Sequence, residues 1–184
     1  MDFLGFLLQR LVVIFIGIVV LFAVQNPHRR ARARSQAVAE QTPVMTELAA
    51  KLGGSLSGPS EAAAWTPRLR RRSKKYEPEL TLTFQRGPWH VRVTEACNPK
   101  PMASDALLRY EHWIEVATDP LPQRALRFDF FELSFEDGFV HTVCQGQIRA
   151  DEIEFLVDMI LETLDLMPGV EPGNPPGPQR GVTA

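Results

Sequence analysis

The chain has 184 residues, a hydrophobic content of 45% and a formal net charge of −2. This length allows one domain of ordinary size with short accessory segments and excludes an array of several full-size domains. The charge is unevenly distributed, with a net charge of +4 over residues 1–35, +4 over residues 36–75 and −10 over residues 76–184. The acidic part would repel phosphate backbones, which disfavours nucleic acid as a partner.

Residues 3–24 are apolar except for Gln9 and Arg10. As a helix they would extend about 33 Å, which is enough to cross a bilayer core of about 30 Å. The alternative is a cleaved secretory signal, but no small-x-small cleavage site follows the apolar block. The sequence therefore predicts a retained transmembrane anchor at residues 1–25.

A basic segment follows the predicted anchor at residues 26–41 and is expected to be a juxtamembrane linker. It contains four arginines within a short distance of the apolar block: Arg29, Arg30, Arg32 and Arg34. Only Arg10 and the amino terminus lie on the other side. Because positive charge is retained on the cytoplasmic side, this asymmetry predicts a single-pass membrane protein whose soluble domain is cytoplasmic.

A soluble domain is expected over residues 42–168. Thr42 is a suitable N-cap residue for a first helix, and Gly53 and Gly54 are a suitable end. Val44, Leu48 and Leu52 would form its apolar stripe.

A second basic cluster follows an expected loop. It contains Arg68, Arg70, Arg71, Arg72, Lys74 and Lys75. Together with the four arginines next to the anchor, these residues are candidates for contact with anionic lipid headgroups. A solvated loop or a basic strand edge remains an alternative interpretation. Contact with nucleic acid is disfavoured, because only Trp65 and Tyr76 are available nearby to stack on bases.

The middle of the chain alternates apolar and polar residues, as β-strands do. Five strands are expected, at residues 79–85, 89–96, 107–117, 126–136 and 139–146. Turns are expected at residues 86–88 and at Asp137-Gly138. The alternation slips at Phe130-Phe131, which indicates a bulge or burial on both faces.

A last helix is expected after Asp151, its predicted cap, and should end at Pro168-Gly169. Its apolar side should contain Ile153, Leu156, Val157, Ile160, Leu164 and Met167. Residues 169–184 are rich in Pro and Gly and are expected to be disordered. The predicted fold is thus α+β: a transmembrane helix, then a meander of about five antiparallel strands covered by an N-terminal and a C-terminal helix.

Few residue patterns in the chain indicate catalysis or metal binding. His90, His112 and His141 lie within predicted strands, and Cys97 and Cys144 lie at strand ends, but none has a close ligand spacing. No nucleophile elbow, phosphate loop or dinucleotide fingerprint occurs. We therefore expect no catalytic residue, no metal and no cofactor. Cys97 and Cys144 would form a disulfide only in an oxidising compartment.

These observations predict a membrane-anchored, non-catalytic protein-interaction module, with the lipid bilayer and an unidentified protein as partners. The expected partner surface consists of an exposed Trp113 and acidic residues of the last helix: Asp151, Glu154, Asp158 and Glu162. Two alternatives remain open. One is an extracytoplasmic domain that binds an envelope component and carries a Cys97–Cys144 disulfide. The other is an enzyme of a type that its sequence motifs do not identify.

Overall fold

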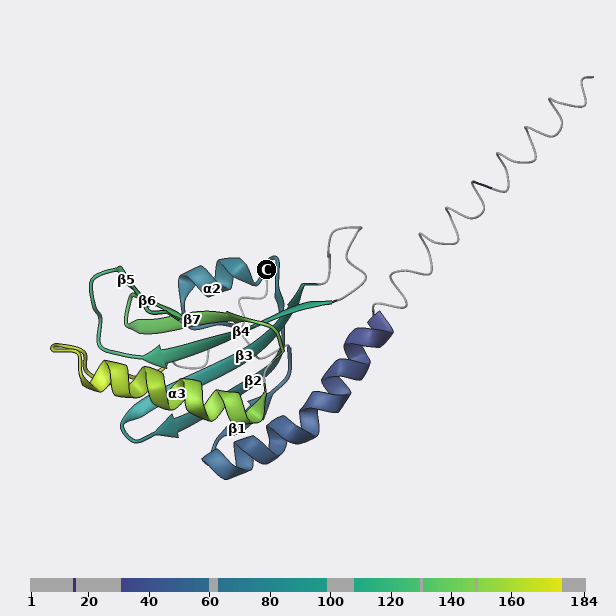
Figure 1. The fold of residues 1–184 in the computed structure, drawn as a ribbon, viewed down its shortest axis with the longest axis horizontal. Helices are drawn as coiled ribbons and strands as arrows, with labels where there is room; N and C mark the ends of the chain where they lie inside the picture. The colour runs from purple at the N-terminus through teal and green to yellow at the C-terminus, as the bar shows by residue number, and fades with distance from the viewer. Residues whose placement is uncertain are drawn as a thin grey trace, which may run out of the picture. The chain divides into compact units, whose positions relative to one another are not determined.

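The computed structural model describes residue 15 and residues 31–59, 63–98, 108–129, 131–147 and 149–176. These ranges form an α+β structure, as predicted, with a seven-stranded antiparallel sheet (Figure 1). The predicted anchor at residues 1–25 lies outside the described residues, except for Phe15. In the described part of the chain, no helix combines the length and the apolar character that a membrane crossing requires.

The chain divides into two compact units, residues 1–39 and 40–184. All contacts reported below lie within the second unit. It contains the strands β1 (Ser55–Ser57), β2 (Glu77–Arg86), β3 (Trp89–Asn98), β4 (Arg109–Ala117), β5 (Arg124–Arg127), β6 (Glu132–Glu136) and β7 (Phe139–Gln145). Its labelled helices are α2 (Pro67–Arg72) and α3 (Ala150–Asp165).

The first helix comprises residues 31–52, so it begins earlier than the predicted start at Thr42, and part of the predicted linker is helical. Its end agrees with the prediction. Gly53 adopts a φ of +64°, and the N–H of Gly54 donates to the carbonyl of Ala49 at 2.8 Å. This left-handed residue followed by a backbone hydrogen bond is a common way to end a helix.

The apolar side of this helix differs from the predicted stripe. Met45, Leu48 and Ala49 are buried, whereas Val44 is exposed. The buried residues are spaced by three and four positions, which is the spacing of one helix face. Lys51 forms an ion pair of 2.6 Å with Glu154, which places residues 40–52 beside α3.

The sheet contains seven strands rather than the five expected from the sequence. The two additional strands come from two segments whose structure differs from the expectation. Residues 55–57 were expected to be loop, but they pair with β2 as β1. The expected long strand at residues 126–136 is the hairpin of β5 and β6. The chain turns between them, where Phe128 donates its N–H to the carbonyl of Phe131 and the two rings stack at 4.8 Å. The irregularity that the sequence indicated at Phe130-Phe131 thus falls at the hairpin between β5 and β6, and Phe130 itself lies outside the described residues.

The strand order is β1-β2-β3-β4-β7-β6-β5, so the sheet is not a simple meander. The first four strands follow one another, but β4 then pairs with β7 rather than with β5. The hairpin of β6 and β7 turns at Asp137 and Gly138, which both have positive φ, as the sequence predicts.

One face of the sheet is covered by α3, which is drawn across the strands in Figure 1. The register places Val91, Ile114 and Val140 on this face. Trp89 donates from Nε1 to Asp165 at 3.0 Å, which fixes the end of α3 to β3. The buried side of α3 consists of Ile153, Val157, Ile160, Leu161 and Leu164. Asp151 does not cap the helix, because Arg149 is the N-cap residue.

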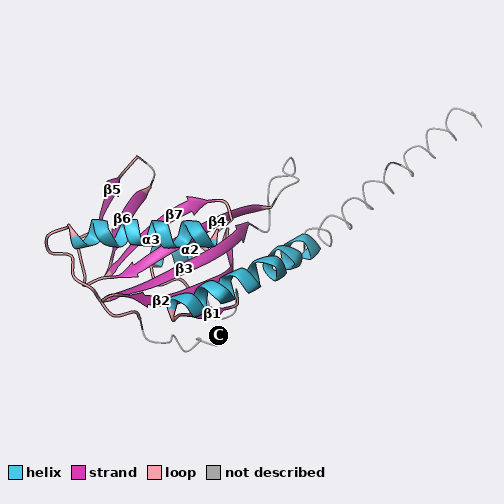
Figure 2. Cartoon of the chain, turned by 60° about the horizontal axis from the view of Figure 1, so that its bottom comes forward, coloured by secondary structure: helices cyan, strands magenta, loops and turns pink. Residues whose placement is uncertain are grey.

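The opposite face is covered by α2, which the sequence did not reveal (Figure 2). Its single buried side chain, Leu69, packs in a cluster with Ala64, Tyr76, Ala96 and Trp113. Both faces of the central strands are therefore covered, and eight of the nine residues of β4 are buried. The predicted cover of an N-terminal and a C-terminal helix was therefore incomplete, because it lacked α2.

The beginning of the predicted disordered tail is part of the folded domain. Asp119 donates its N–H to the carbonyl of Glu171 at 2.9 Å, and Gly173 donates to Ala117 at 3.2 Å. Val170 is buried. The packed region thus extends past residue 168, and residues 177–184 lie outside the described ranges.

Candidate functional site

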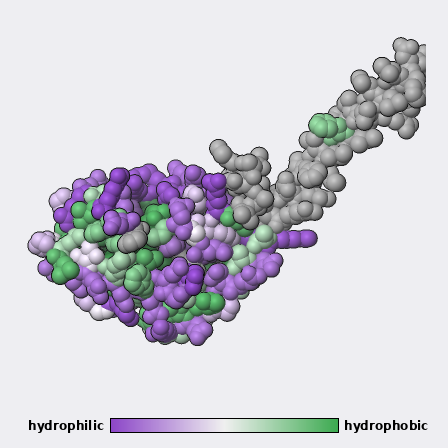
Figure 3. Space-filling model, viewed as in Figure 1, coloured by the Kyte–Doolittle hydropathy of each residue, from purple (hydrophilic) through white to green (hydrophobic). Residues whose placement is uncertain are grey.

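The outward side of α3 carries two large apolar side chains that do not pack in the core. Phe155 is 68% exposed, and Leu166, at the C-cap, is 86% exposed. Both lie on the side of the helix away from the buried Ile153 and Val157. Figure 3 shows a mainly hydrophilic surface with separate hydrophobic spots on the side of the domain seen in Figure 1.

The predicted acidic residues surround Phe155 at helical spacing. Asp151 precedes it by one turn, Asp158 follows by about one turn and Glu162 by about two. We call Asp151, Phe155, Asp158, Glu162 and Leu166 the α3 surface. Phe155 was absent from the predicted partner surface, although its position on the acidic side of the helix was a readable signal.

Three of the four predicted acidic residues form ion pairs. Glu154 pairs with Lys51, and Asp158 accepts two hydrogen bonds from Arg86, at 2.9 and 3.1 Å. The hydrogen bond from Arg149 lowers the pKa of Asp151. The paired carboxylates of Asp151 and Asp158 thus lie beside Phe155, while Glu162 is an exposed carboxylate further along the helix.

Trp113 is not part of any partner surface, which corrects the prediction. Its side chain is fully buried, and its Nε1 donates to Oε1 of Glu111 at 2.8 Å. The alternation of residues in the sequence correctly indicated that Trp113 lies on the same face of β4 as Glu111 and Glu115. The error arose because α2 covers that face.

The second basic cluster forms α2 and the turn after it, and its residues have different roles. Arg70 donates to the carbonyl of Trp65 at 2.7 Å, and Arg72 forms two hydrogen bonds with Glu111. These two side chains hold the helix on the sheet. Arg68, Arg71, Lys74 and Lys75 are exposed, and Arg72 is exposed in part although it is bound to Glu111. In the first cluster, Arg32 is exposed, Arg34 is half-buried, and Arg29 and Arg30 lie outside the described residues.

Charged residues are buried beneath α2. Glu115 is fully buried, accepts a hydrogen bond from the N–H of Thr66 at 2.8 Å, and lies 3.7 Å from Nε of Arg92. Burial raises the pKa of Glu115, and the neighbouring Arg92 opposes this shift. Burial also lowers the pKa of Arg92. Glu115 lies in β4, and its hydrogen-bond donor Thr66 directly precedes α2. We infer that the buried carboxylate and its neighbour Arg92 hold the segment before α2 against the sheet.

The two cysteines are not joined, and their positions disfavour the disulfide that the extracytoplasmic alternative would require. Cys97 is opposite Tyr110 in β4, and Cys144 is opposite His112 on the other side of the same strand. The two cysteines therefore lie on the two strands that flank β4, and their Cα atoms are separated by at least two strand spacings, about 10 Å. The Cα atoms of a disulfide lie less than about 7 Å apart. The register excludes this bridge unless the sheet rearranges.

Cys144 and His112 are neighbours but do not form an activated thiol pair. Burial raises the pKa of Cys144 and lowers the pKa of His112. Both side chains are therefore neutral near pH 7, and a nucleophilic cysteine requires the opposite shift of its thiol pKa.

The three described histidines do not form one cluster. The register places His90 and His112 on opposite faces of the sheet. Across the described ranges, no group of three His, Cys, Asp or Glu side chains has a geometry that could hold a metal ion.

Comparisons with models of known protein families, with curated proteins and with solved structures each found no match.

Proposed function

We propose that the chain is a membrane-anchored, non-catalytic interaction module that binds a protein partner through the α3 surface. The observation that supports this most strongly is the exposure of Phe155 among ordered carboxylates. An aromatic side chain held on a rigid helix can enter an apolar pocket of a partner with little loss of conformational freedom.

The chemistry of the surface indicates the character of the partner. Burial of an exposed Phe side chain contributes about 2–3 kcal/mol, which is the scale of a binding hot spot. The carboxylates around it would be complemented by lysines or arginines at the rim of the partner's pocket. The proposed partner is therefore a protein with an apolar pocket surrounded by basic side chains.

The membrane part of the proposal rests on the sequence. The apolar block at residues 3–24 and the arginines after it support a single-pass anchor with the domain on the cytoplasmic side. The exposed basic residues Arg68, Arg71, Lys74 and Lys75 support contact of the domain with anionic headgroups.

Site-specific photocrosslinking in cells tests the proposed partner surface. A photoreactive phenylalanine analogue is placed at Phe155 in one variant and at Gln85, an exposed residue of β2, in the control. We expect a discrete adduct from position 155 in the membrane fraction and none from position 85.

A second substitution checks that the adduct reports binding. With the photoreactive group at Glu162, the same adduct should form and should be lost when Phe155→Asp is added. Phe155 is exposed, so this change should leave the fold intact. Equal adducts at positions 155 and 85, or persistence of the Glu162 adduct in the Phe155→Asp variant, would contradict the proposal.

A further inference from the structure

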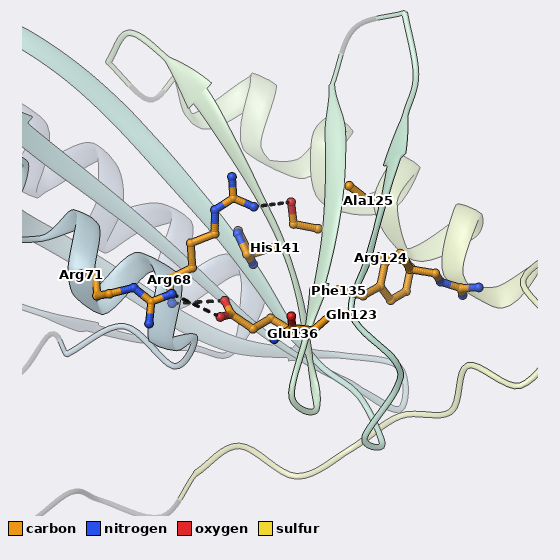
Figure 4. Close-up of a pocket in the computed structure, with 9 residues that line it drawn as sticks. Arg68, Arg71, Gln123, Arg124, Ala125, Phe135, Glu136 and His141 are labelled. Carbon is orange, nitrogen blue, oxygen red and sulfur yellow. Dashed lines mark hydrogen bonds and ion pairs between the residues drawn. The ribbon is translucent and has the colours of Figure 1, made fainter.

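A hollow of about 360 Å³ lies beside α2 on the face of β6 and β7 (Figure 4). Ser134 and His141 line its floor, and Arg68 and Arg71 line the side formed by α2. The hairpin of β5 and β6 borders the opposite side, at Ala125. This volume exceeds the space that one inorganic anion needs and is large enough for a small organic molecule.

The Arg68 guanidinium reaches into this hollow without a carboxylate partner among the described residues. Its Nη1 donates to Oγ of Ser134 over a long distance of 3.4 Å, the bond drawn in Figure 4. The backbone N–H of Arg68 donates to Oε2 of Glu136 at 3.1 Å. The Arg71 guanidinium lies 3.8 Å from the same carboxylate. Glu136 therefore interacts with the backbone of α2 and with Arg71 and leaves the Arg68 guanidinium available.

The floor contains a buried polar atom with no partner. His141 is only 3% exposed, and its Nδ1 has no hydrogen-bond partner in the described part of the chain. Burial and, to a lesser degree, the nearby Arg68 lower the pKa of His141 to about 4. The imidazole is thus neutral near pH 7, and in one tautomer its Nδ1 carries a proton that can be donated.

The register places these groups next to one another. Ser134 of β6 and His141 of β7 are directly opposite in the sheet, and their side chains point to the face that α2 partly covers. A guanidinium, a hydroxyl and an imidazole N–H are three groups of the kind that bind oxyanions. The Ser134 hydroxyl donates to Oε1 of Glu132 over a long distance of 3.5 Å, a weak bond that a ligand oxygen would replace. Few acceptors of the hollow compete for the Arg68 charge, because Glu136 is already bound to α2.

We propose that this hollow is a binding site for the oxyanion group of a small organic molecule, with Arg68, Ser134 and His141 as its donors. A carboxylate and a phosphate share this chemistry, and either can be the source. The hollow is larger than a single oxyanion group, so the ligand carries a further organic body beside that group. This site is separate from the α3 surface and does not depend on the proposed protein partner.

The proposal is tested by calorimetric titration of the full chain in a non-ionic detergent at pH 7. The probes are phenyl phosphate, benzoate and benzyl alcohol, which share an aromatic body and differ in the anionic group. The variant is Arg68→Gln, and the control is Arg149→Gln. Arg149 is exposed, lies outside the hollow and gives the same change in net charge.

We expect phenyl phosphate, benzoate or both to bind, and benzyl alcohol not to bind at concentrations up to about 10 mM. Binding of only one anion identifies the source of the oxyanion. Arg68→Gln should weaken binding at least about tenfold, because it removes the guanidinium that contacts Ser134, while Arg149→Gln should have no effect.

Three results would overturn the proposal. The first is absence of binding for both anions to the wild-type chain. The second is equal binding of benzyl alcohol, which would indicate an apolar site. The third is the same loss of affinity in Arg68→Gln and Arg149→Gln, which would indicate a general charge effect. Ser134→Ala gives a second check and should weaken binding without changing the net charge.

Discussion

The guanidinium of Arg72 forms two hydrogen bonds with the carboxylate of Glu111, at 2.5 Å from Nε and 2.7 Å from Nη2. The hydrogen bond with Glu111 raises the pKa of Arg72, so this guanidinium remains charged. Glu111 is fully buried and also accepts the indole N–H of Trp113. This pair connects α2 to β4, the central strand of the sheet. It thereby positions the hollow beside α2 and the exposed basic residues Arg68, Arg71, Lys74 and Lys75.

Loss of the Arg72 side chain should destabilise the domain strongly. Arg72→Met leaves the carboxylate of Glu111 buried without its cation, and we expect the free energy of unfolding to fall by about 3 kcal/mol. Chemical denaturation followed by tryptophan fluorescence measures this change.

Arg71→Met is the matched control in the same helix. The Arg71 side chain is 70% exposed and lies 3.8 Å from its carboxylate, so its loss should change stability by less than about 0.5 kcal/mol. The double variant Arg72→Met/Glu111→Leu should recover part of the loss. Similar effects of Arg71→Met and Arg72→Met would refute the structural role of the pair.

The end of the first helix provides a steric test of the packing. A Cβ atom at Gly54 would lie 2.5 Å from the carbonyl oxygen of Thr83 and 2.7 Å from Cβ of Phe84. Gly54→Ala should therefore lower the free energy of unfolding by about 1–3 kcal/mol. Gly58→Ala is the control, because nothing lies within 4 Å of its Cβ, and its effect should stay within about 0.5 kcal/mol. Equal stability of the two variants would show that residues 53–57 do not pack on β2 as described.

The buried His141 should make stability depend on pH. Its pKa is about 4 in the folded state and about 6.5 in the unfolded chain, so between these values only the unfolded state binds the proton. Stability should consequently fall as the pH falls from 6.5 to 4, by at most about 3 kcal/mol from this residue.

Denaturation of His141→Gln at pH 7 and pH 4 isolates this contribution. The variant should lose less stability over that range than the wild type does. His112, whose pKa burial also lowers, should cause a remaining decrease of the same sign. If both proteins lose the same stability, His141 does not have the depressed pKa.

The exposed basic residues of α2 and of the turn after it should contribute to membrane contact. A fragment of residues 31–184 is expected to sediment with anionic vesicles at low salt and to be released as salt increases. The double substitution Arg71→Gln/Lys74→Gln should weaken this binding about thirtyfold, at roughly 1 kcal/mol per residue. Arg127→Gln/Arg149→Gln gives the same change in net charge away from α2 and is the control. Equal sedimentation of the two double variants would contradict a specific lipid-facing surface.

The sheet was largely predictable because its strands alternate and its turns have distinctive residues. Asp137-Gly138 marks the β6–β7 hairpin, and Gly87 marks the β2–β3 turn with a φ of +58°. The order of the strands was not predictable, because the placement of β7 between β4 and β6 depends on contacts far apart in the sequence.

The missed elements share a physical cause. α2 has six residues and one buried side chain, Leu69, so it is too short to show an amphipathic period or to be stable alone. Its coverage of the sheet explains why Trp113 and Glu111, which read as a polar face, are buried. Gly173 reads as a disordered tail residue, yet a Cβ there would lie 2.1 Å from the carbonyl oxygen of Thr118. Close backbone packing of this kind leaves no pattern in the sequence.

The candidate surfaces were predictable only in part. The acidic side of α3 follows from helical spacing, but the exposure of Phe155 depends on which helix face meets the sheet. The hollow beside α2 has no sequence signature, because Arg68 and His141 are brought together by α2 and β7.

The most direct test of the central claim, that an anchor holds this domain at the cytoplasmic membrane surface, is the accessibility of a single cysteine in intact cells. Val182→Cys is combined with Cys144→Ala, and Cys97 is retained because it is fully buried. The cells are treated with a membrane-impermeant maleimide before and after lysis. The account predicts that the chain is in the membrane fraction and that position 182 is labelled only after lysis. Labelling in intact cells would contradict the cytoplasmic orientation, and recovery of the chain in the soluble fraction would contradict the anchor.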